Sequence, residues 1–515
     1  MRGRSPRDRE FTMSISSIVV CAAEMSAIEQ RLFDAGMPVA ALMEKVAGLI
    51  AQEVRQRYPK PACVGVLVGP GHNGGDAVVV ARELHLQGYE VRICQPLDKG
   101  KELTKSHLKY AMSLGIPVTQ TVASLKPCDV IIDGLFGFGL TRDLTGDLAE
   151  TVTTLNSWPQ PVVSIDLPSG IHTNTGAVLG IALQATETLC LGLWKRAFFQ
   201  EAALPYLGKA TLIDFGIPKA DVDAILGEPA QIQRLTWEKT QTFLPLPRPT
   251  VTHKYKQGHL LLVVGSSRYA GGAILAALGA RASGVGMLSI AVPESLKPLL
   301  VSQLPEALIY ACPETPTGAI AHFPELLSDL NQFSAIATGC GLTTDATPII
   351  KQLLATDAPL ILDADGLNIL AKLNPVQTLA QREAPTVLTP HLGEFKRLFP
   401  AISPHDRLEA AQKAARESNA IVLLKGAKSA IAHPDGALWL IPASTPALAR
   451  GGSGDVLTGL IGGLIAPSRP EMPLEATVAT AAGWHAQAGI LAAQERTELG
   501  VDAFTLTQFL VQVLS

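Results

Sequence analysis

The sequence predicts an α/β protein of two domains, each built on a largely parallel β-sheet. The chain has 515 residues, about three times the ~150 residues typical of one domain. Short apolar runs alternate with helix-length segments in two separate series, which is typical of parallel strands joined by crossover helices. Between the two series, at about residues 216–258, prolines are frequent and long periodic segments are rare. A domain boundary is therefore expected there.

Composition and charge exclude several classes of protein. Hydrophobic residues make up 47% of the chain and charged residues 17%, which excludes a disordered or coiled-coil protein. The formal net charge is −4, so neither nucleic acid nor a membrane surface is an expected partner. The seven cysteines contain no C-x-x-C pair, which fits neither a disulfide framework nor a zinc knuckle. A cytoplasmic protein is expected.

Two segments resemble targeting or membrane signals and are interpreted otherwise. Residues 1–12 contain four arginines, but Asp8 and Glu10 interrupt them and no apolar region with a cleavage site follows. No targeting peptide is predicted there, and Met13 is an alternative start of translation. The uncharged stretch 476–494 contains His485 and is rich in alanine, so it is predicted to be a buried core helix.

The first series predicts a doubly wound domain. An apolar run at 63–68 enters the glycine-rich residues 69–71, and a helix is expected from 77 to 86. Further strands are predicted at 91–94, 130–133 and 162–166.

The second series predicts another α/β domain. Its strands are expected at 260–264, 288–292, 335–338, 360–363, 386–388 and 421–424. Residues 429–433 and 437–441, joined by Pro-Asp-Gly, are typical of a hairpin. The second sheet is therefore predicted to have an antiparallel edge.

In the first domain, the strongest signal is the segment His72-Asn73-Gly74-Gly75-Asp76 between a strand and a helix. Glycines at a helix start let backbone N–H groups approach a phosphate. The segment lacks both the G-x-G-x-x-G fingerprint and the P-loop lysine, and a mere tight connection is the alternative.

Two other predicted strands of this domain end on an acidic residue. Asp133 precedes a glycine-rich loop, and Asp166 precedes Leu-Pro-Ser-Gly. Ligands of open α/β sheets bind beyond the carboxyl ends of the strands, so these loops form a candidate site. Capping of a helix or a turn is the alternative role for each aspartate.

These motifs, together with Ala-Ala-Glu-Met at 22–25, resemble the NAD(P)H-hydrate epimerase domain over about residues 13–230. The resemblance implies a Rossmann-like fold, an acid or base at Asp166, and a potassium ion held by Asn73, Asp133 and Ser169. It also implies contacts with the hydrate from Asn73, Gly74, Gly75, Asp76, Gly137, Phe138, Gly139, Leu140, Thr141, Arg142, Asp143 and Asp166. His72 stands where the family more usually has asparagine.

The most specific signal of the second domain is Gly-Gly-Ser-Gly at 451–454, followed by Asp455 and an apolar helix. Backbone N–H groups at that helix start would stabilise negative charge on a transferred phosphoryl group. Asp455 could accept the proton of the attacking hydroxyl, and the field of the helix start is expected to keep it ionised. The alternative is an N-capping aspartate.

Two further segments of the second domain suggest a nucleotide site. Lys425 ends a strand and precedes a turn of small residues, which suits phosphates or a ribose. His391 and Glu394 lie at a helix start, where a capping or surface role is the alternative for the histidine.

These segments, with Leu-Asp-Ala-Asp at 362–365, resemble the ADP- or ATP-dependent NAD(P)H-hydrate dehydratase domain of the ribokinase-like superfamily over about residues 237–515. The resemblance implies that Ala273, Gly341, His391 and Asp455 contact the hydrate. It also implies that Lys425, Gly426, Ala427, Lys428, Ser429 and Gly454 bind the adenine nucleotide. This chain departs from the usual family pattern at Tyr255, Lys256, His259, Cys340 and Arg450.

Taken together, the two resemblances imply a bifunctional repair enzyme. The first domain would interconvert the R and S hydrates. The second would use ADP or ATP with Mg²⁺ to phosphorylate the S hydrate, after which phosphate leaves. A homo-oligomer is expected. A vitamin kinase and a non-catalytic first domain are the alternatives.

Overall fold

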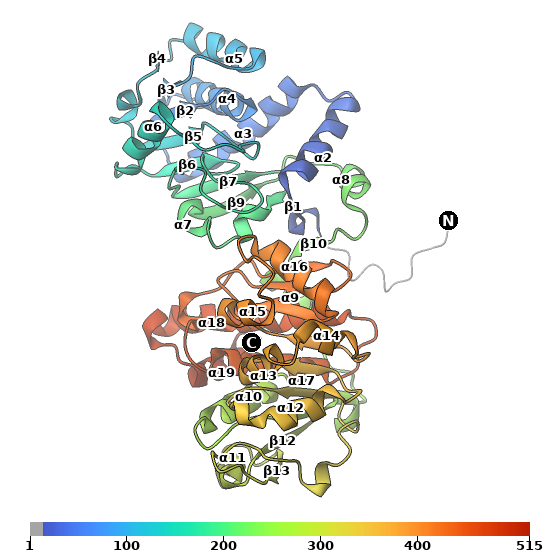
Figure 1. The fold of residues 1–515 in the computed structure, drawn as a ribbon. Coiled ribbons are helices and arrows are strands. Elements are labelled where there is room, and N and C mark those ends of the chain that lie inside the picture. The colour runs from blue at the N-terminus through green and yellow to red at the C-terminus, as the bar shows by residue number, and fades with distance from the viewer. Residues whose placement is uncertain (1–13) are drawn as a thin grey trace. The chain divides into compact units, whose positions relative to one another are not determined.

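The computed structural model describes residues 14–515, which form two compact units that divide between Gln231 and Ile232 (Figure 1). Met13 and the arginines before it lie outside the described residues, so the alternative start stays a prediction. The boundaries 13–230 and 237–515 likewise stay predictions. Every predicted strand is present, with ends within one residue of those expected.

The first unit is built on a parallel sheet, which within residues 14–231 has the strand order β4-β3-β2-β5-β6-β7-β9. These strands are β2 (Cys63–Val68), β3 (Glu90–Cys94), β4 (Val118–Thr119), β5 (Val130–Gly134), β6 (Val162–Ile165), β7 (Glu187–Leu191) and β9 (Lys209–Ile213). A short parallel pair, β1 (Val19–Val20) and β8 (Trp194–Lys195), stands apart from it.

The strand order reverses at β2, since β3 and β4 continue to one side of it and β5 begins the other. In open α/β sheets such a reversal opens a crevice at the carboxyl ends of the two strands concerned. Here those ends lead into the glycine-rich residues 69–71 and into the loop that follows Asp133. The fold therefore brings two of the predicted motifs together.

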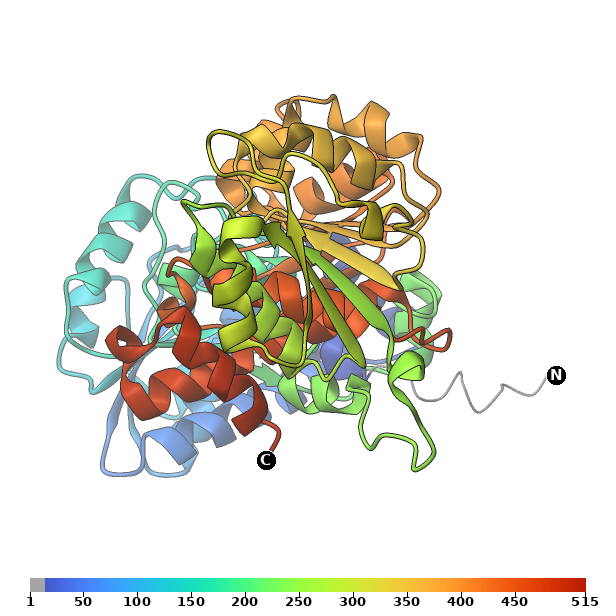
Figure 2. The ribbon, with the colours of Figure 1, turned by 90° about the horizontal axis from the view of Figure 1, so that it is seen from below.

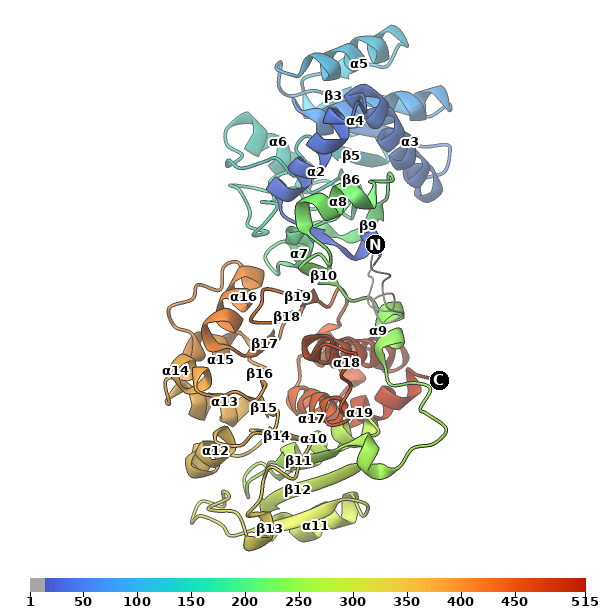
Figure 3. The same cartoon turned by 90° about the vertical axis from the view of Figure 1, so that its right-hand side faces the viewer.

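Helices cover both faces of this sheet, which confirms the doubly wound class (Figure 3). Alternate residues of β2 supply the two cores: Val64, Val66 and Val68 pack in one cluster, and Leu67 packs in the other. The helices are α2 (Ala22–Asp34), α3 (Val39–Arg57), α4 (His72–Leu86), α5 (Glu102–Ser113), α6 (Asp147–Asn156), α7 (Leu204–Leu207) and α8 (Lys219–Leu226).

Helix α4 begins five residues earlier than predicted, at His72 instead of residue 77. Glycine disfavours helix, so the sequence suggested a loop. Packing overrides this tendency, because a Cβ at Gly74 would lie 1.9 Å from the Gly69 carbonyl oxygen and one at Gly75 would lie 2.6 Å from Met43. The two glycines let α4 approach the loop after β2 and helix α3.

The second unit contains a larger mixed sheet, which within residues 232–515 has the order β10-β19-β18-β17-β16-β15-β14-β11-β12-β13. Its strands are β10 (Ile232–Arg234), β11 (His259–Val263), β12 (Met287–Pro293), β13 (Leu308–Cys312), β14 (Ala335–Thr338), β15 (Leu360–Leu362), β16 (Thr386–Leu388), β17 (Ile421–Leu424), β18 (Ala430–Ala432) and β19 (Leu438–Leu440). The predicted hairpin is confirmed, because β18 pairs antiparallel with both β17 and β19. The strand order reverses between β11 and β14, which places a second crevice there.

The edge of this sheet beyond the hairpin is β10, a strand that sequence analysis missed. It has only three residues and lies in the proline-rich stretch that was interpreted as a boundary. It pairs in parallel with β19, from Ile232 opposite Leu438 to Arg234 opposite Leu440. The second unit therefore needs the chain from residue 232 onward to complete its sheet.

We expect a fragment of residues 232–515 to fold by itself, whereas a fragment that starts at residue 237 exposes the edge of β19. An unpaired edge favours aggregation and removes the hydrogen bonds of β10. Thermal melting and size-exclusion chromatography of both fragments check this expectation. An unfolded 232–515 fragment beside an active whole chain would contradict independent folding of the units.

Helices flank this sheet in two layers, with α10, α17, α18 and α19 on one side and α12 to α16 on the other (Figure 2, Figure 3). They are α9 (Trp237–Phe243), α10 (Ala270–Ala282), α11 (Lys297–Gln303), α12 (Thr347–Leu354), α13 (Ala364–Ala371), α14 (Pro375–Ala380), α15 (Leu392–Leu398), α16 (Arg407–Ser418), α17 (Ser453–Ile465), α18 (Leu474–Arg496) and α19 (Ala503–Gln512).

Small residues let α10 and α17 pack with their backbones in contact. A Cβ at Gly459 would lie 1.8 Å from the Ala276 carbonyl oxygen, and one at Gly279 would lie 2.1 Å from that of Val456. Helix α18 is buried along most of its length, as predicted for residues 476–494. Among residues 14–515, the helices are all too short or too polar to cross a bilayer.

Candidate active sites

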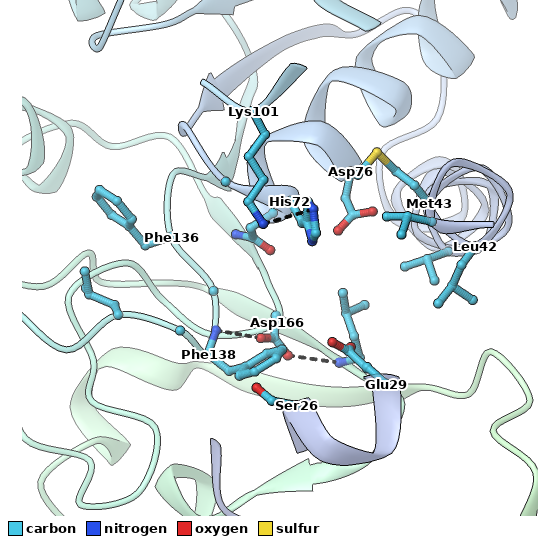
Figure 4. Close-up of a pocket in the computed structure, with 18 of the residues that line it drawn as sticks. Ser26, Glu29, Leu42, Met43, His72, Asp76, Lys101, Phe136, Phe138 and Asp166 are labelled. Atoms are coloured by element: carbon cyan, nitrogen blue, oxygen red, sulfur yellow. Dashed lines mark hydrogen bonds between the residues drawn. The ribbon is translucent and has the colours of Figure 1, made fainter. Parts of the chain in front are cut away.

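The first unit has a cavity of about 700 Å³ at the reversal between β2 and β5 (Figure 4). Its wall comes from α2, α3, the start of α4 and the loop after β5. Of the residues predicted to contact the hydrate, those on the wall are Asn73, Asp76, Gly137, Phe138, Gly139, Leu140, Thr141, Arg142 and Asp166. Gly74 and Gly75 are buried in packing contacts instead, and Asp143 is exposed.

Asp133 is fully buried and its carboxylate accepts four hydrogen bonds. Oδ1 accepts from Ser169 Oγ at 2.6 Å and from the Leu135 amide at 3.1 Å, and Oδ2 accepts from Ser164 Oγ and the Ser169 amide, both at 2.9 Å. Burial raises the pKa of Asp133, although these donors oppose the rise. Two of the three predicted potassium ligands, Asp133 and Ser169, are therefore in direct contact.

The third predicted ligand, Asn73, has a buried side-chain nitrogen without a hydrogen-bond partner. Its Oδ1 would lie 3.1 Å from a Cβ at Gly137, so the glycine lets the loop approach Asn73 closely. Within residues 14–515, no group of three or more His, Cys, Asp or Glu side chains is arranged to hold a metal ion. A cation in this unit would thus depend on amide, hydroxyl and carbonyl oxygens beside a single carboxylate.

Asp166 adopts a left-handed backbone conformation with φ of +68° and is buried. Its Oδ2 accepts a hydrogen bond from the Phe138 amide at 2.9 Å, and its Oδ1 lies 2.6 Å from the ammonium of Lys195. A non-glycine residue in this region of φ costs about 1 kcal/mol or more and is held by surrounding contacts. The contacts here fix the carboxylate at the cavity wall.

Lys195 was missed by sequence analysis, although its side chain is fully buried. Burial alone would lower the pKa of Lys195, but the charges of Asp166, Cys190 and Glu29 raise it above its ordinary value. The ammonium therefore stays charged against Asp166. A lysine inside the apolar stretch 189–199 was the available signal, because a buried lysine needs a partner.

His72, the departure from the family pattern in this unit, is the first residue of α4 and is exposed. Its Nε2 lies 3.0 Å from the Nζ of Lys101, which also lines the cavity. Partial desolvation of the ring and the charge of Lys101 lower the pKa of His72, so the neutral ring accepts a hydrogen bond from the lysine.

The second unit has a cavity of about 440 Å³ at the reversal between β11 and β14. Its wall includes Gly341 and Asp455, as predicted, together with Tyr269, Gly272 and Asp365. Ala273 is buried on α10 and does not reach this wall.

Helix α17 begins at Ser453. Its N-cap residue is Gly452, which has φ of +92° and no side chain that could cap the helix. Asp455 lies in the first turn, where its carboxyl group contacts the thiol of Cys340 and would lie 3.3 Å from a Cβ at Gly272. Asp455 is therefore not the N-cap, and it faces the cavity from the start of the helix.

Asp455 was expected to be kept ionised by the helix start, and its surroundings in the folded protein shift its pKa upward. Burial and the charge of Asp363 raise the pKa of Asp455 to about 6, while Cys340 and Lys425 oppose the rise. The cost of desolvating the carboxylate exceeds the stabilisation that Cys340 and Lys425 provide. Asp455 is consequently ionised mainly above pH 6.

A buried ion pair joins the predicted nucleotide segment to α17. Lys425 Nζ lies 2.7 Å from Asp363 Oδ1, and Thr458 donates to Asp363 Oδ2 at 2.7 Å. A Cβ at Gly454 would lie 3.3 Å from the same ammonium, so Lys425 and Gly454 are adjacent, as predicted. Asp363 was quoted only as part of a family motif, and its role in holding Lys425 was not predicted.

Other residues of that segment point elsewhere. Lys428 donates to the Pro442 carbonyl, and burial lowers its pKa. Ser429 Oγ lies 3.4 Å from the Gly426 carbonyl oxygen. A nucleotide contact of these residues and of Ala427 stays a prediction.

His391 is the N-cap of α15 and is exposed. Its Nδ1 accepts from the Gly393 amide at 2.9 Å, while Glu394 accepts from the His391 amide at 2.9 Å. The capping alternative therefore describes this geometry, and contact with the hydrate stays a prediction.

The departures from the family pattern fall into two groups. The first group lies at or before the amino end of β11 and consists of Tyr255, Lys256 and His259. Since β11 has five residues, these positions are about 13 Å or more from the carboxyl end of the strand, where the cavity lies. Arg450 donates to the Val501 carbonyl at 2.8 Å. Only Cys340, which contacts Asp455, reaches the candidate catalytic group.

Both units thus carry a cavity at the carboxyl ends of parallel strands, and each cavity has an aspartate on its wall, Asp166 in the first unit and Asp455 in the second. This arrangement defines a two-domain α/β enzyme with separate small-molecule sites.

Comparison with known proteins agrees with this class. Residues 39–197 match the family model of the YjeF-related protein N-terminus, and residues 260–512 match that of NAD(P)H-hydrate dehydratase. The bifunctional NAD(P)H-hydrate repair enzyme of Synechocystis sp. is 58% identical over 96% of this chain and 94% of its own length. The enzyme of that name from Thermosynechococcus vestitus is 51% identical over 96% of this chain and 97% of its own length.

Among solved structures, the ADP/ATP-dependent NAD(P)H-hydrate dehydratase from Bacillus subtilis, co-crystallised with ATP/Mg²⁺, is 32% identical. The match covers 54% of this chain and 96% of the Bacillus subtilis chain, with a TM-score of 0.46. On the strength of the full-length relatives, this chain belongs to the family of bifunctional NAD(P)H-hydrate repair enzymes. Both resemblances predicted from the sequence are confirmed, and so is the α/β fold class of the two domains.

Proposed function

We propose that this chain repairs hydrated nicotinamide cofactors at two sites. The first unit interconverts (R)- and (S)-NAD(P)H-hydrate. The second dehydrates the S form to NAD(P)H at the expense of ADP or ATP, and releases AMP or ADP with phosphate. The observation that carries this proposal is the presence of two separate cavities, with Asp166 on one wall and Asp455 on the other, in a member of this family.

At the first site, Asp166 accepts or donates the proton of the hydroxyl on carbon 6. The Phe138 amide and Lys195 hold its carboxylate in place, and one lone pair of Oδ2 remains free for that proton. The predicted contact residues on the cavity wall bind the hydrate around it.

A potassium ion in this unit would be held by Asn73, Asp133 and Ser169. The buried side-chain nitrogen of Asn73, which has no hydrogen-bond partner, supports the fit, since an amide turned the other way offers an oxygen. Ser169 Oγ donates its hydrogen to Asp133 at 2.6 Å and accepts from the Phe136 amide, which leaves one oxygen lone pair for a cation. A hard, weakly hydrated cation suits such oxygen donors.

We expect exchange of K⁺ for Li⁺ at equal ionic strength to slow epimerisation and leave dehydration of S hydrate unchanged. Li⁺ is too small for a site shaped by these side chains, whereas the second unit does not contain them. Initial rates with R and with S hydrate as separate substrates check this expectation. Equal epimerisation rates in both salts would contradict a potassium site.

At the second site, Asp455 accepts the proton of the S hydrate's hydroxyl as the nucleotide transfers its terminal phosphoryl group to that oxygen. The predicted residues 425–429 and Gly454 bind the nucleotide, with Lys425 beside the start of α17. Hydroxide is a poor leaving group and phosphate a good one. Loss of phosphate from carbon 6 and of a proton from carbon 5 then forms the double bond of NAD(P)H.

Mg²⁺ bound with the nucleotide would shield its phosphate charge during transfer. Asp365, a carboxylate on the cavity wall, is an oxygen ligand of the kind that Mg²⁺ prefers. Its Oδ2 accepts from the Thr343 amide at 3.0 Å, which orients the side chain.

The proposal is tested by incubating the protein with mixed R and S hydrates, first with ADP and then with ATP, while NADH absorbance is followed. Full conversion with at least one nucleotide is expected. Accumulation of a phosphorylated hydrate would favour the kinase alternative, and conversion that stops at the S half would favour a non-catalytic first unit.

Two further expectations accompany the proposed function. A cytoplasmic location is consistent with the state of all seven cysteines, which are free thiols. A homo-oligomer stays a prediction, for which light scattering of the purified chain is the measurement.

A further inference from the structure

The wall of the first cavity includes one face of α2, to which the sequence assigned no function. Ser26, Glu29 and Gln30 of this helix line the cavity together with Asp76 and Asp166. In Figure 4 the carboxyl groups of Glu29, Asp76 and Asp166 face the same space from three different elements. Helix α2 thus adds an acidic side chain next to the proposed acid or base.

The position of Glu29 follows from the pattern of α2. The helix is fixed at its start by a capping box between Cys21 and Glu24, and it buries Met25, Ile28 and Leu32. Glu29 follows Ile28 and lies four residues after Met25, at the border of the buried face. A glutamate there is partly buried, so it differs from one on a solvated helix face.

The charged groups facing Glu29 are Lys195, Asp166 and Asp76. The buried ammonium of Lys195 therefore interacts with two of these carboxyl groups, those of Asp166 and Glu29, and it is paired with Asp166 at 2.6 Å. Burial raises the pKa of Glu29 to about 7, with Lys195 opposing the rise and Asp166 adding to it. Burial and the charges of Glu29 and Asp166 also raise the pKa of Asp76 well above its usual range.

The proposed reaction requires proton transfer at two different atoms. Carbon 6 of the hydrate carries the hydroxyl and is bonded to the ring nitrogen. Opening the ring at that bond takes a proton from the oxygen and puts one on the nitrogen. Asp166 is held in one place by Lys195 and the Phe138 amide, which suits only one of these transfers. A second group that carries a proton near neutral pH is needed.

We propose that Glu29 is a second catalytic residue of the first site, the proton donor that acts opposite Asp166; this rests on the proposed epimerase function. Asp166 accepts the hydroxyl proton, and the electron pair of that bond forms the double bond between carbon 6 and oxygen. The bond between carbon 6 and nitrogen breaks toward nitrogen, which takes its proton from Glu29. The product of this step is an open-chain aldehyde.

Closure of the ring on the opposite face of the aldehyde completes the epimerisation. Rotation about the bond between carbons 5 and 6 presents the opposite face of the aldehyde to the nitrogen. The nitrogen attacks carbon 6 and returns its proton to Glu29, while the oxygen takes back the proton held by Asp166. Atoms and electrons balance without an oxidant, a reductant or a co-reactant.

The test is Glu29→Gln in the full chain, assayed with R hydrate and ADP and separately with S hydrate and ADP. Gln keeps the size and polarity of the side chain but cannot donate a carboxylic proton. Conversion of R hydrate should fall by about 10²-fold or more, the usual contribution of a general acid, while turnover of S hydrate stays at the parental rate. Glu150→Gln, an exposed glutamate on α6, is the matched control and should change neither rate.

Two readouts separate a catalytic from a structural role. Because the donor must be protonated, kcat/KM for R hydrate should fall as pH rises above about 7, and Glu29→Asp should regain more activity than Gln. The raised pKa of Glu29 means that its ionisation costs stability as pH rises. Glu29→Gln should therefore melt at a higher temperature than the parent at pH 8.

Failure of this inference is distinct from failure of the proposed function. Parental conversion of R hydrate by Glu29→Gln would overturn the role of Glu29 while the epimerase assignment stands. Loss of activity together with a lowered melting temperature at pH 8 would also overturn it. If the parent protein itself converts S hydrate but not R hydrate, the proposed epimerase function is the part that fails.

Discussion

Replacing Asp455 by Asn is expected to reduce turnover of S hydrate by about 10²- to 10⁴-fold in a folded protein that still binds nucleotide. Asn keeps the size of the side chain and its place beside Cys340, but it cannot accept the hydroxyl proton. The N-cap of α17 is Gly452 and makes no side-chain capping bond, so the substitution removes no cap. The loss should therefore appear in the chemical step.

Stability provides an independent check on the same variant. The pKa of Asp455 is raised in the folded protein to about 6, so its ionisation costs stability as pH rises from about 4 to 6. Asp455→Asn should relieve that cost by up to about 3 kcal/mol of unfolding free energy at pH 7, and by little at pH 4. The sign is opposite to that expected for loss of a helix cap, about 1 kcal/mol of destabilisation.

The measurements are S-hydrate turnover and melting temperature on one preparation, at pH 4.5 and pH 7.5. Asp357→Asn, an exposed aspartate before β15, is a matched control that should change neither. In the parent, kcat/KM for S hydrate should rise with pH up to about 6. Turnover of Asp455→Asn within a few-fold of the parent would show that another group accepts the proton.

Replacing Asp166 by Asn is expected to abolish conversion of R hydrate and to spare that of S hydrate. A racemic mixture with ADP should then stop after the S half, apart from slow spontaneous epimerisation. Asn tolerates the left-handed backbone of this position, so the substitution does not strain the loop. The rate of the second phase of NADH formation measures the loss.

The single variant leaves Lys195 buried without its partner, which typically costs about 3–5 kcal/mol. The double variant Asp166→Asn, Lys195→Gln removes that unpaired charge and keeps the result interpretable. It should melt closer to the parent and remain inactive toward R hydrate. Recovery of R-hydrate conversion in the double variant would exclude Asp166 as an essential acid or base.

Sequence analysis found residues that line the two cavities where the motif consists of neighbouring residues. The segment 451–455, the acid at the end of β5 and the acid after β6 are local patterns, and parallel strands bring their carboxyl ends to one edge. Strand positions were predictable where a strand is a conspicuous apolar run between polar or glycine-rich turns. Seven shorter or less regular strands were missed, namely β1, β4, β7, β8, β9, β10 and β13.

What sequence analysis missed depends on contacts between distant residues. Lys195 meets Asp166 across 29 positions of the chain, and Lys425 meets Asp363 across 62. Motifs marked Asp166, Asp363 and Lys425 separately, but no local pattern predicts which lysine pairs with which aspartate. Glu29 faces the cavity only because α2 packs where it does. The early start of α4 and the pairing of β10 likewise reflect packing that overrides local propensity.

The central claim is that two separate sites on one chain share the repair, and mixing two variants tests it most directly. Asp166→Asn alone should consume only the S half of a racemic hydrate mixture with ADP, and Asp455→Asn alone should consume almost none. Each variant retains one intact site, so an equimolar mixture should convert the whole racemate to NADH faster than spontaneous epimerisation allows. A mixture that stops at the S half would contradict the account.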